Sequence, residues 1–202
     1  MIKIRIVRYF IYTLWKQKIF SHLEIRKIKY SLEVILNELL KLVVLILIFA
    51  SLKSLEVLLF SLVFLIPIRI FSGGIHFESS FKCLIFTAGF FLLILAFYPL
   101  LPSKNPSLYF LSFISLTLIT IFSPAPNEYR PNVVQKNRAT YKMLAFAITL
   151  GSLALLYLLI ESQKYFAVGF ITIMLQATQL IINYFIRFIF NLKRRNKNEI
   201  IL

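Results

Sequence analysis

The two residues best suited to catalysis in this sequence are His76 and Cys83, which are seven positions apart. A cysteine thiolate is a strong nucleophile, and a nearby imidazole can accept the proton that the thiol loses. Cys83 is the sole cysteine, and the chain has 2 histidines and no aspartate. These counts exclude an intrachain disulfide, a histidine-rich metal site and any catalytic triad that needs Asp. A Cys–His dyad is therefore one interpretation of the pair, and we expect no metal or cofactor.

The spacing of the pair restricts the backbone between them. Seven residues of straight helix rise by about 10.5 Å, which is too far for a hydrogen bond between the two side chains. We therefore predict that residues 73–82 do not form one straight helix. Gly73 and Gly74 permit backbone angles that would let the chain fold back. The alternative interpretation is that Cys83 is a small apolar residue at the start of a helix and His76 a polar loop residue.

Positive charge near Cys83 favours its thiolate form. Arg69 and Lys82 are cationic, and Cys83 lies where a helix is expected to begin, at its electropositive end. The oxyanion that forms during an attack on a carbonyl would need hydrogen-bond donors. Our candidates are backbone N–H groups near Cys83 or at Gly73 and Gly74, with Arg69 as a charged helper.

The composition places this chemistry in a membrane. The 202 residues are 59% hydrophobic and 15% charged, and the mean hydropathy is +0.83. Soluble domains carry about 25% charged residues, so a soluble globular domain is excluded. The net charge of +15 suits anionic membrane lipids or an acidic partner at the membrane, and we expect no nucleic-acid binding.

Apolar segments of membrane-spanning length follow a basic N-terminal region. A helix needs about 17–25 residues to cross a bilayer. We predict an all-α, polytopic integral membrane protein with about six transmembrane helices, near residues 34–52, 55–71, 83–101, 107–123, 143–160 and 165–190. The six spans form one membrane domain over 34–190. Residues 1–33 are predicted to be amphipathic and helical at the cytoplasmic membrane face, and 191–202 a basic cytoplasmic tail.

The distribution of Lys and Arg predicts the orientation. With a cytoplasmic N-terminus, 19 of the 23 cationic residues fall on the cytoplasmic side of the six spans. This asymmetry obeys the positive-inside rule and places both termini in the cytoplasm. The connection that carries His76 and Cys83 is then also cytoplasmic.

A second basic loop, residues 123–142, is predicted on the same face. Its Arg130, Lys136 and Arg138 are candidates for binding carboxylates of a substrate. The alternative is that these charges only fix the topology and bind lipid headgroups. Both interpretations stay open at the level of the sequence.

Polar residues recur along the last span at helical spacing. They are Thr172, Gln176, Gln179, Asn183 and Arg187, and they share one helix face. Polar groups in lipid need a partner or a wet cavity. The stripe therefore either lines a substrate path, with Gln176 and Gln179 binding substrate, or forms hydrogen bonds to another span or subunit. Glu38 and Lys41 are expected to pair or snorkel, and Gly89 and Gly151 to allow close helix approach.

The stretch Arg69-x3-Gly73-Gly74-x-His76-x6-Cys83, between two apolar segments of a basic chain of this length, resembles the accessory gene regulator protein B (AgrB) family. The resemblance implies a membrane cysteine endopeptidase of Gram-positive bacteria with His76 and Cys83 as catalytic residues. Arg69, Gly73 and Gly74 match the supporting positions of the motif. The implied substrate is a quorum-sensing precursor peptide with an amphipathic leader and an acidic C-terminal tail. The family resemblance also suggests a homodimer.

The resemblance implies cleavage of the C-terminal tail through a thioester on Cys83. Attack by a substrate thiol or hydroxyl would then release a cyclic thiolactone or lactone autoinducing peptide. The other function class is a non-enzymatic membrane protein, either a peptide exporter or a subunit of a membrane complex. That class would tolerate the replacement of Cys83 by serine.

Overall fold

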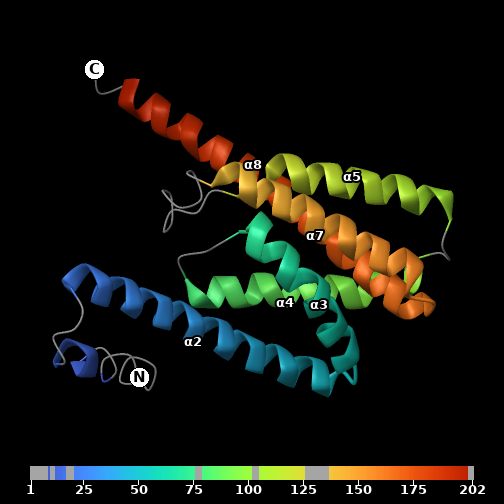
Figure 1. Ribbon diagram of the computed structural model, residues 1–202, viewed down its shortest axis with the longest axis horizontal. Helices are drawn as coiled ribbons and strands as arrows, with labels where there is room; N and C mark the ends of the chain where they lie inside the picture. The colour runs from blue at the N-terminus through green and yellow to red at the C-terminus, as the bar shows by residue number, and fades with distance from the viewer. Residues whose placement is uncertain are drawn as a thin grey trace. The chain divides into compact units, whose positions relative to one another are not determined.

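The protein is described by a computed structural model that covers residues 9, 12–16, 21–75, 79–101, 105–125 and 137–199, with the side chains of Tyr30 and 190–199 left out. No strand occurs in these residues, which confirms the predicted all-α fold. The long helices are α2 (His22–Ser51), α3 (Leu55–Ser72), α4 (Ser80–Phe97), α5 (Pro106–Phe122), α7 (Arg138–Leu158) and α8 (Gln163–Glu199) (Figure 1). A short 3-10 helix, η1 (Tyr98–Leu100), extends α4.

Each of the six predicted apolar segments corresponds to one of these helices. Within the described ranges, five helices are long and apolar enough to cross a membrane. The other, α5, has 17 residues, so its length is about 26 Å at 1.5 Å per residue. That length is at the lower limit for a span. The chain is a polytopic membrane protein, as the composition predicted.

The chain divides into two compact units, and the first, residues 1–53, contains α2. Ser21 and Glu24 form a capping box at the start of α2: the Glu24 N–H donates to Ser21 Oγ, and the Ser21 N–H donates to Glu24 Oε2. No proline or glycine interrupts the following 30 residues. The division predicted at residue 33 therefore falls inside one continuous helix. Lys41 pairs with Glu38, as expected.

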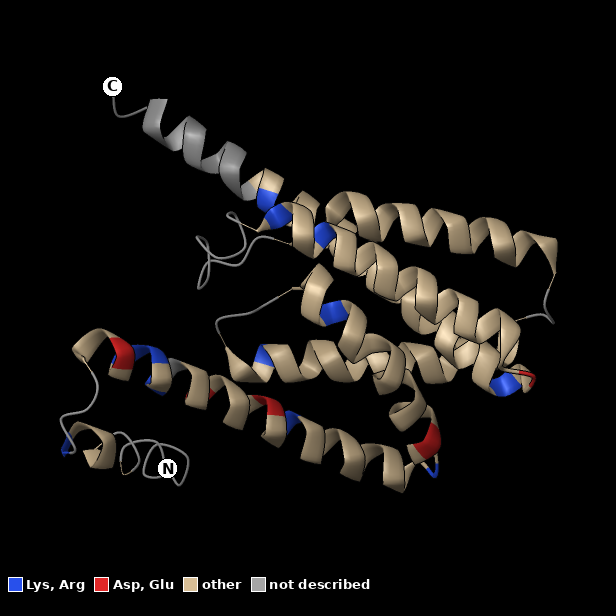
Figure 2. Ribbon diagram, in the orientation of Figure 1, with Lys and Arg blue, Asp and Glu red and all other residues tan. Residues whose placement is uncertain are grey.

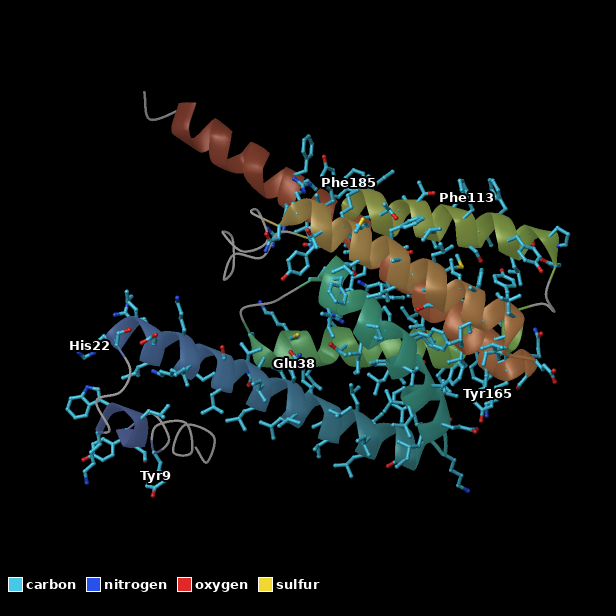
Figure 3. All side chains as sticks on the ribbon, viewed as in Figure 1. Tyr9, His22, Glu38, Phe113, Tyr165 and Phe185 are labelled. Atoms are coloured by element: carbon cyan, nitrogen blue, oxygen red, sulfur yellow. The ribbon has the colours of Figure 1, made fainter. Side chains whose placement is uncertain are left out.

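The second unit, residues 54–202, is a helix bundle built around α8. Helix α8 packs against α3, α4, α5 and α7. Of the residues in the apolar stretch of α8, 67% are buried. The corresponding share is 39% in α3 and 22% in both α4 and α7. The surrounding helices turn apolar side chains outward, as Phe113 does on α5 (Figure 3). This is the pattern of a bundle whose outer face meets lipid.

Contacts at the two ends show that α3, α5 and α8 run in the same direction. Glu56 in the first turn of α3 accepts hydrogen bonds from Lys164 and Tyr165 in the first turn of α8. At the other end, the segment after α3 contacts both the segment after α5 and the middle of α8. Helices α4 and α7 begin at this second end, so consecutive spans alternate in direction.

The glycines that allow close helix packing differ from those expected. A Cβ added at Gly89 or Gly151 would meet no atom within 4 Å, so neither glycine packs closely against another part of the described chain. A Cβ at Gly169 would come within 2.5 Å of Leu156 Cδ2. The expectation that Gly89 and Gly151 allow close helix approach was therefore wrong for the described residues. Gly169 instead allows α8 to lie close to α7.

Candidate functional site

The segment Ser72–Ile75, which we call the glycine corner, ends α3 and starts the connection to α4. The Gly73 N–H donates to Arg69 O over 2.9 Å, and Gly73 has a φ of +77°. A side chain is disfavoured at this angle, so glycine is needed here. Because α3 ends at Ser72 and α4 begins at Ser80, the prediction of a broken helix between these points is confirmed.

The glycine corner is closed on one side by the chain that follows α5. The Ala125 N–H donates to Ser72 O over 2.8 Å. A Cβ added at Gly73 would lie 3.0 Å from Ala125 Cβ and 3.3 Å from its nitrogen. Gly73 therefore meets two requirements at once, the positive φ and the close approach of a second backbone.

The polar face of α8 closes the other side. Gln176 Nε2 donates to Ser72 Oγ over 3.0 Å and to Gly73 O over 2.9 Å. Asn183 Nδ2 lies 3.5 Å from Gly74 O, and Asn183 Oδ1 accepts from Arg187 Nε at 3.3 Å. The interpretation that this stripe bonds to another part of the chain is confirmed for Gln176 and Asn183. Substrate binding by the stripe stays a prediction.

Arg69 and Gln179 lie close to Gly74. A Cβ added at Gly74 would be 3.0 Å from Arg69 Nε and 3.0 Å from Gln179 Nε2. The Arg69 guanidinium also donates from Nη2 to Ile75 O at 3.4 Å. Arg69, Gly73, Gly74, Gln176 and Gln179, five of the residues selected from the sequence, are thus brought together at the glycine corner.

Cys83 lies in the first turn of α4 and is 8% exposed. Its N–H donates to Ser79 O over 3.1 Å, the first hydrogen bond of the helix. Its carbonyl accepts from Thr87 Oγ1 at 2.8 Å. Lys82 beside it is exposed. A thiol at this position lies near the positive end of the helix dipole, as the sequence predicted.

Two of the candidate oxyanion donors are already used. The N–H of Gly73 bonds to Arg69 O, and the N–H of Cys83 bonds to Ser79 O, both within helix ends. Neither group could bind a substrate oxygen without breaking a backbone hydrogen bond. The remaining candidates from the sequence are the N–H of Gly74 and the Arg69 guanidinium.

Several predicted residues fall elsewhere. His76, Arg130 and Lys136 lie outside the described residues, so the dyad and the basic loop stay predictions. Arg138 is the exposed first residue of α7. One turn later, the ring of Tyr141 lies 6.2 Å from that of Phe71, which places the start of α7 beside the end of α3.

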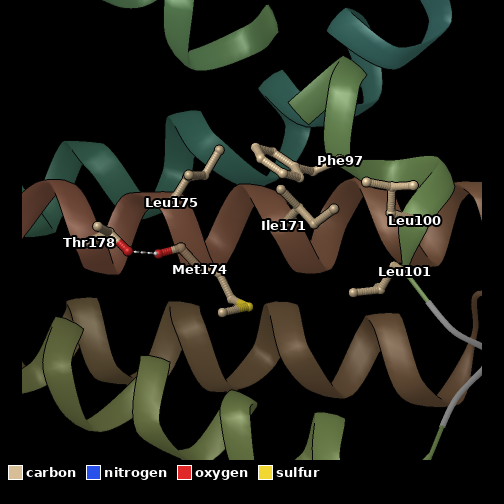
Figure 4. A pocket seen from close by; sticks show the side chains of 7 residues that line it. All are labelled: Phe97, Leu100, Leu101, Ile171, Met174, Leu175 and Thr178. Carbon is tan, nitrogen blue, oxygen red and sulfur yellow. Dashed lines mark hydrogen bonds between the residues drawn. The ribbon is translucent and has the colours of Figure 1, made fainter. Parts of the chain in front are cut away.

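An apolar pocket of about 290 Å³ lies on another face of α8 (Figure 4). It is lined by Phe97, Leu100, Leu101, Ile171, Met174, Leu175 and Thr178. The hydroxyl of Thr178 already donates to Met174 O at 3.0 Å. The rest of this lining is apolar.

Sequence reasoning missed Ser72 and Ala125 as parts of the site. Ser72 accepts two hydrogen bonds, one at its carbonyl from Ala125 and one at its hydroxyl from Gln176. A serine at the end of an apolar span is common, and the pairing with Ala125 joins segments far apart in sequence. The one indication in the sequence was the polar stripe on α8, whose side chains needed hydrogen-bond partners somewhere in the protein.

Comparison with known proteins gives one consistent result. The sequence model of the family described as Accessory gene regulator B matches residues 5–180. An AgrB-like protein of Clostridium beijerinckii is 38% identical over 174 residues, which cover 86% of this chain and 85% of that protein. No solved structure matches the chain.

Proposed function

This chain belongs to the accessory gene regulator B family, and from that premise we propose that it is a membrane cysteine endopeptidase. Membership in the family supports involvement in the agr quorum-sensing system. The proposed reaction removes the C-terminal tail of a precursor peptide and promotes closure of the remaining core into a thiolactone or lactone. His76 and Cys83 are the proposed catalytic residues.

The placement of Cys83 is the observation that carries this proposal. It is a buried thiol in the first turn of α4, directly after the connection that begins at the glycine corner. In sequence, His76 precedes Ser79 by three residues, and an extended chain spans at most about 3.6 Å per residue. Three residues of extended chain span at most about 11 Å and end at Ser79, the N-cap of α4, so this short connection permits an approach of His76 to Cys83.

The first half of the proposed reaction is acyl transfer to the enzyme. His76 takes the proton from Cys83 Sγ, and the thiolate attacks a carbonyl carbon of the precursor. The C–N bond breaks as His76 returns the proton to the leaving amine. The tail departs with a new N-terminus, and the leader and core remain bound to Cys83 as a thioester. Arg69 stabilises the negative charge on the carbonyl oxygen.

The second half closes the ring. A thiol of the precursor core attacks the thioester carbonyl and displaces Cys83 Sγ, so one thioester replaces another. A hydroxyl in place of the thiol would give a lactone. Water competes for the same carbonyl, so the site must exclude it. Because a thioester lies above an amide in free energy, removal of the tail or of the product drives the overall reaction.

The distribution of charge supports a cytoplasmic site. In the described part of residues 54–189, the cationic residues at the glycine-corner end are Arg69, Lys82, Arg138, Lys142 and Arg187 (Figure 2). At the opposite end, Lys164 is paired with Glu56. By the positive-inside rule we place the glycine-corner end, and both termini, in the cytoplasm. Anionic lipids and an acidic precursor tail are the proposed partners, and a homodimer is the proposed assembly.

The test uses the full chain reconstituted in lipid vesicles and a candidate precursor peptide that has an amphipathic leader and an acidic C-terminal tail. Cleavage is followed by mass spectrometry of the tail and of the cyclic product. We expect Cys83→Ala and His76→Ala to lower cleavage by at least about a hundredfold, the range typical of a lost acid–base group. Normal cleavage by both variants would remove the dyad from the mechanism.

The exporter alternative is examined with the same vesicles. Cys83 is the sole cysteine, so an alkylating reagent modifies this site alone. A peptidase stops cleaving after alkylation, whereas an exporter continues to move peptide across the vesicle membrane. Transport that survives both alkylation and Cys83→Ser, without any cleavage, would favour the exporter.

A further inference from the structure

Four buried polar side-chain atoms at the glycine corner lack a hydrogen-bond partner among the described residues. They are Ser123 Oγ, Gln176 Oε1, and both Oε1 and Nε2 of Gln179. Ser123 is two residues before Ala125, which bonds to the corner backbone. An unpaired polar group in a protein interior is costly, and native proteins keep few of them. Their concentration at one place needs an explanation.

Gln176 and Gln179 differ in how they meet the corner. Gln176 is fully buried and uses its amide nitrogen to hold Ser72 and Gly73. Gln179, less than one turn further along α8, is 2% exposed, and neither of its amide atoms bonds to a residue that the structure describes. Gln179 therefore adds no hydrogen bond to the structure of the corner. Its carboxamide is directed at Gly74, beside Arg69.

The unpaired amide atoms of Gln179 complement the hydrogen-bonding groups of a peptide backbone. The Gln179 carboxamide offers one donor nitrogen and one acceptor oxygen, which match the carbonyl and the N–H of a peptide backbone. A phosphate or carboxylate would meet the acceptor oxygens of Gln176 and Gln179 as well as the donor. A metal ion would lie next to the Arg69 cation, which would repel it. A neutral backbone segment satisfies donor and acceptor together.

We propose that Gln179 binds the backbone of the precursor peptide at the glycine corner, pairing with one carbonyl and one N–H of the substrate. This rests on the proposed peptidase function and deepens it by naming the residue that holds the substrate main chain. Gln176 is the structural member of the pair and Gln179 the binding member. Arg69, on the other side of Gly74, is placed to meet the same substrate segment.

The first test separates binding from structure with Gln179→Met in the full chain in vesicles. Methionine has a similar length and no polar amide, and the change breaks no internal hydrogen bond. We expect KM for the precursor to rise about tenfold, which corresponds to about 1.4 kcal/mol, while the melting temperature stays equal or rises. The matched control is Gln163→Met at the exposed start of α8, where the amide donates to Leu101 O. This control should leave KM unchanged.

The second test changes the substrate as well as the protein, so that each protein is compared with itself on two substrates. The wild-type protein receives precursors in which one backbone amide at a time, near the cleavage site, is replaced by an ester that lacks the N–H. One ester position should weaken binding in wild type but not in Gln179→Met, as a double-mutant cycle requires for a direct contact. Binding is measured in the Cys83→Ala background, so that it is read without catalysis.

The outcomes separate this inference from the proposed function. If wild type cleaves the precursor, but Gln179→Met has the same KM and shows no coupling to any ester position, the proposed role of Gln179 is overturned. A buried water would then be the partner of its amide group. A lower kcat with a lower melting temperature and no ester coupling would make Gln179 structural and also overturn it. Failure of wild type to cleave any precursor would instead reject the peptidase function.

Discussion

Gln176 on α8 donates a hydrogen bond of 3.0 Å to Ser72 Oγ at the end of α3, across 104 positions of sequence. The same amide nitrogen reaches Gly73 O at 2.9 Å. A helix that would otherwise be a simple membrane span thus fixes the backbone of the proposed catalytic connection. A larger share of α8 is buried than of α3, α4 or α7, so the glycine corner is attached to the helix around which the bundle is built.

Replacing Gln176 with leucine should therefore damage the site more than a surface change on the same helix. The variant loses two hydrogen bonds, to Ser72 Oγ and to the part-buried Gly73 O, each worth about 0.5–1.5 kcal/mol. We expect a lower melting temperature in detergent and at least about a tenfold loss of precursor cleavage. Gln163→Leu is the control. Equal cleavage by Gln176→Leu and wild type would show that the corner does not need this support.

The sequence predicted the fold because its strongest signals are local. Six apolar stretches of span length and a strong charge asymmetry are readable without knowing any contact, and each stretch became a helix. The sequence did not show the end of the N-terminal amphipathic region, since the capping box at Ser21 and Glu24 starts a helix that runs through residue 33. Apolar periodicity does not reveal where such a helix leaves the membrane surface.

The candidate site was predictable in its residue types and only partly in its contacts. Gly73 and Gly74 indicated a turn, and Gln176 and Gln179 indicated a polar face that needed partners. Gln176 bonds to Ser72, whereas the amide of Gln179 meets no partner among the described residues. This difference depends on where each side chain lies relative to Ser72, and only the packing of α3 on α8 determines that. The spacing of polar residues along one helix does not tell which residues of another helix they will face.

Alanine at Gly73 should disrupt the corner, whereas alanine at Gly89 should not. The φ of +77° at Gly73 costs a residue with a Cβ about 1–2 kcal/mol. The added methyl would also press on Ala125 at 3.0 Å. Gly89, in the middle of α4, has no atom within 4 Å of the added position. Melting temperature and cleavage rate should both fall for Gly73→Ala and stay near wild type for Gly89→Ala. The reverse order would contradict the geometry of the corner.

Arg69 is expected to act through both its charge and its shape. It lies against Gly74 and donates to Ile75 O, and lysine would keep the charge without the planar group of five donors. We expect Arg69→Lys to lower cleavage about tenfold, consistent with the loss of one charge-assisted hydrogen bond. Arg69→Gln also removes the charge, so we expect its cleavage rate to be lower still.

Alkylation of Cys83 at pH 7 distinguishes the two contributions of Arg69. If the charge of Arg69 increases the reactivity of Cys83 Sγ, the labelling rate should fall in Arg69→Gln and be kept in Arg69→Lys. The sole cysteine makes this rate specific to the site. Equal labelling in all three proteins would assign Arg69 to substrate contact alone.

The opposite end of the α3–α8 pair should tolerate change. Glu56 accepts hydrogen bonds from Lys164 and Tyr165, but its side chain and that of Lys164 are 51% and 37% exposed. Exposed ion pairs contribute about 0–1 kcal/mol because water competes for both charges. Glu56→Gln should therefore lower the melting temperature only slightly and leave cleavage within about twofold of wild type, in contrast to Gln176→Leu at the corner. A large loss of cleavage from Glu56→Gln would mean that both ends of α3 must be fixed for the glycine corner to function.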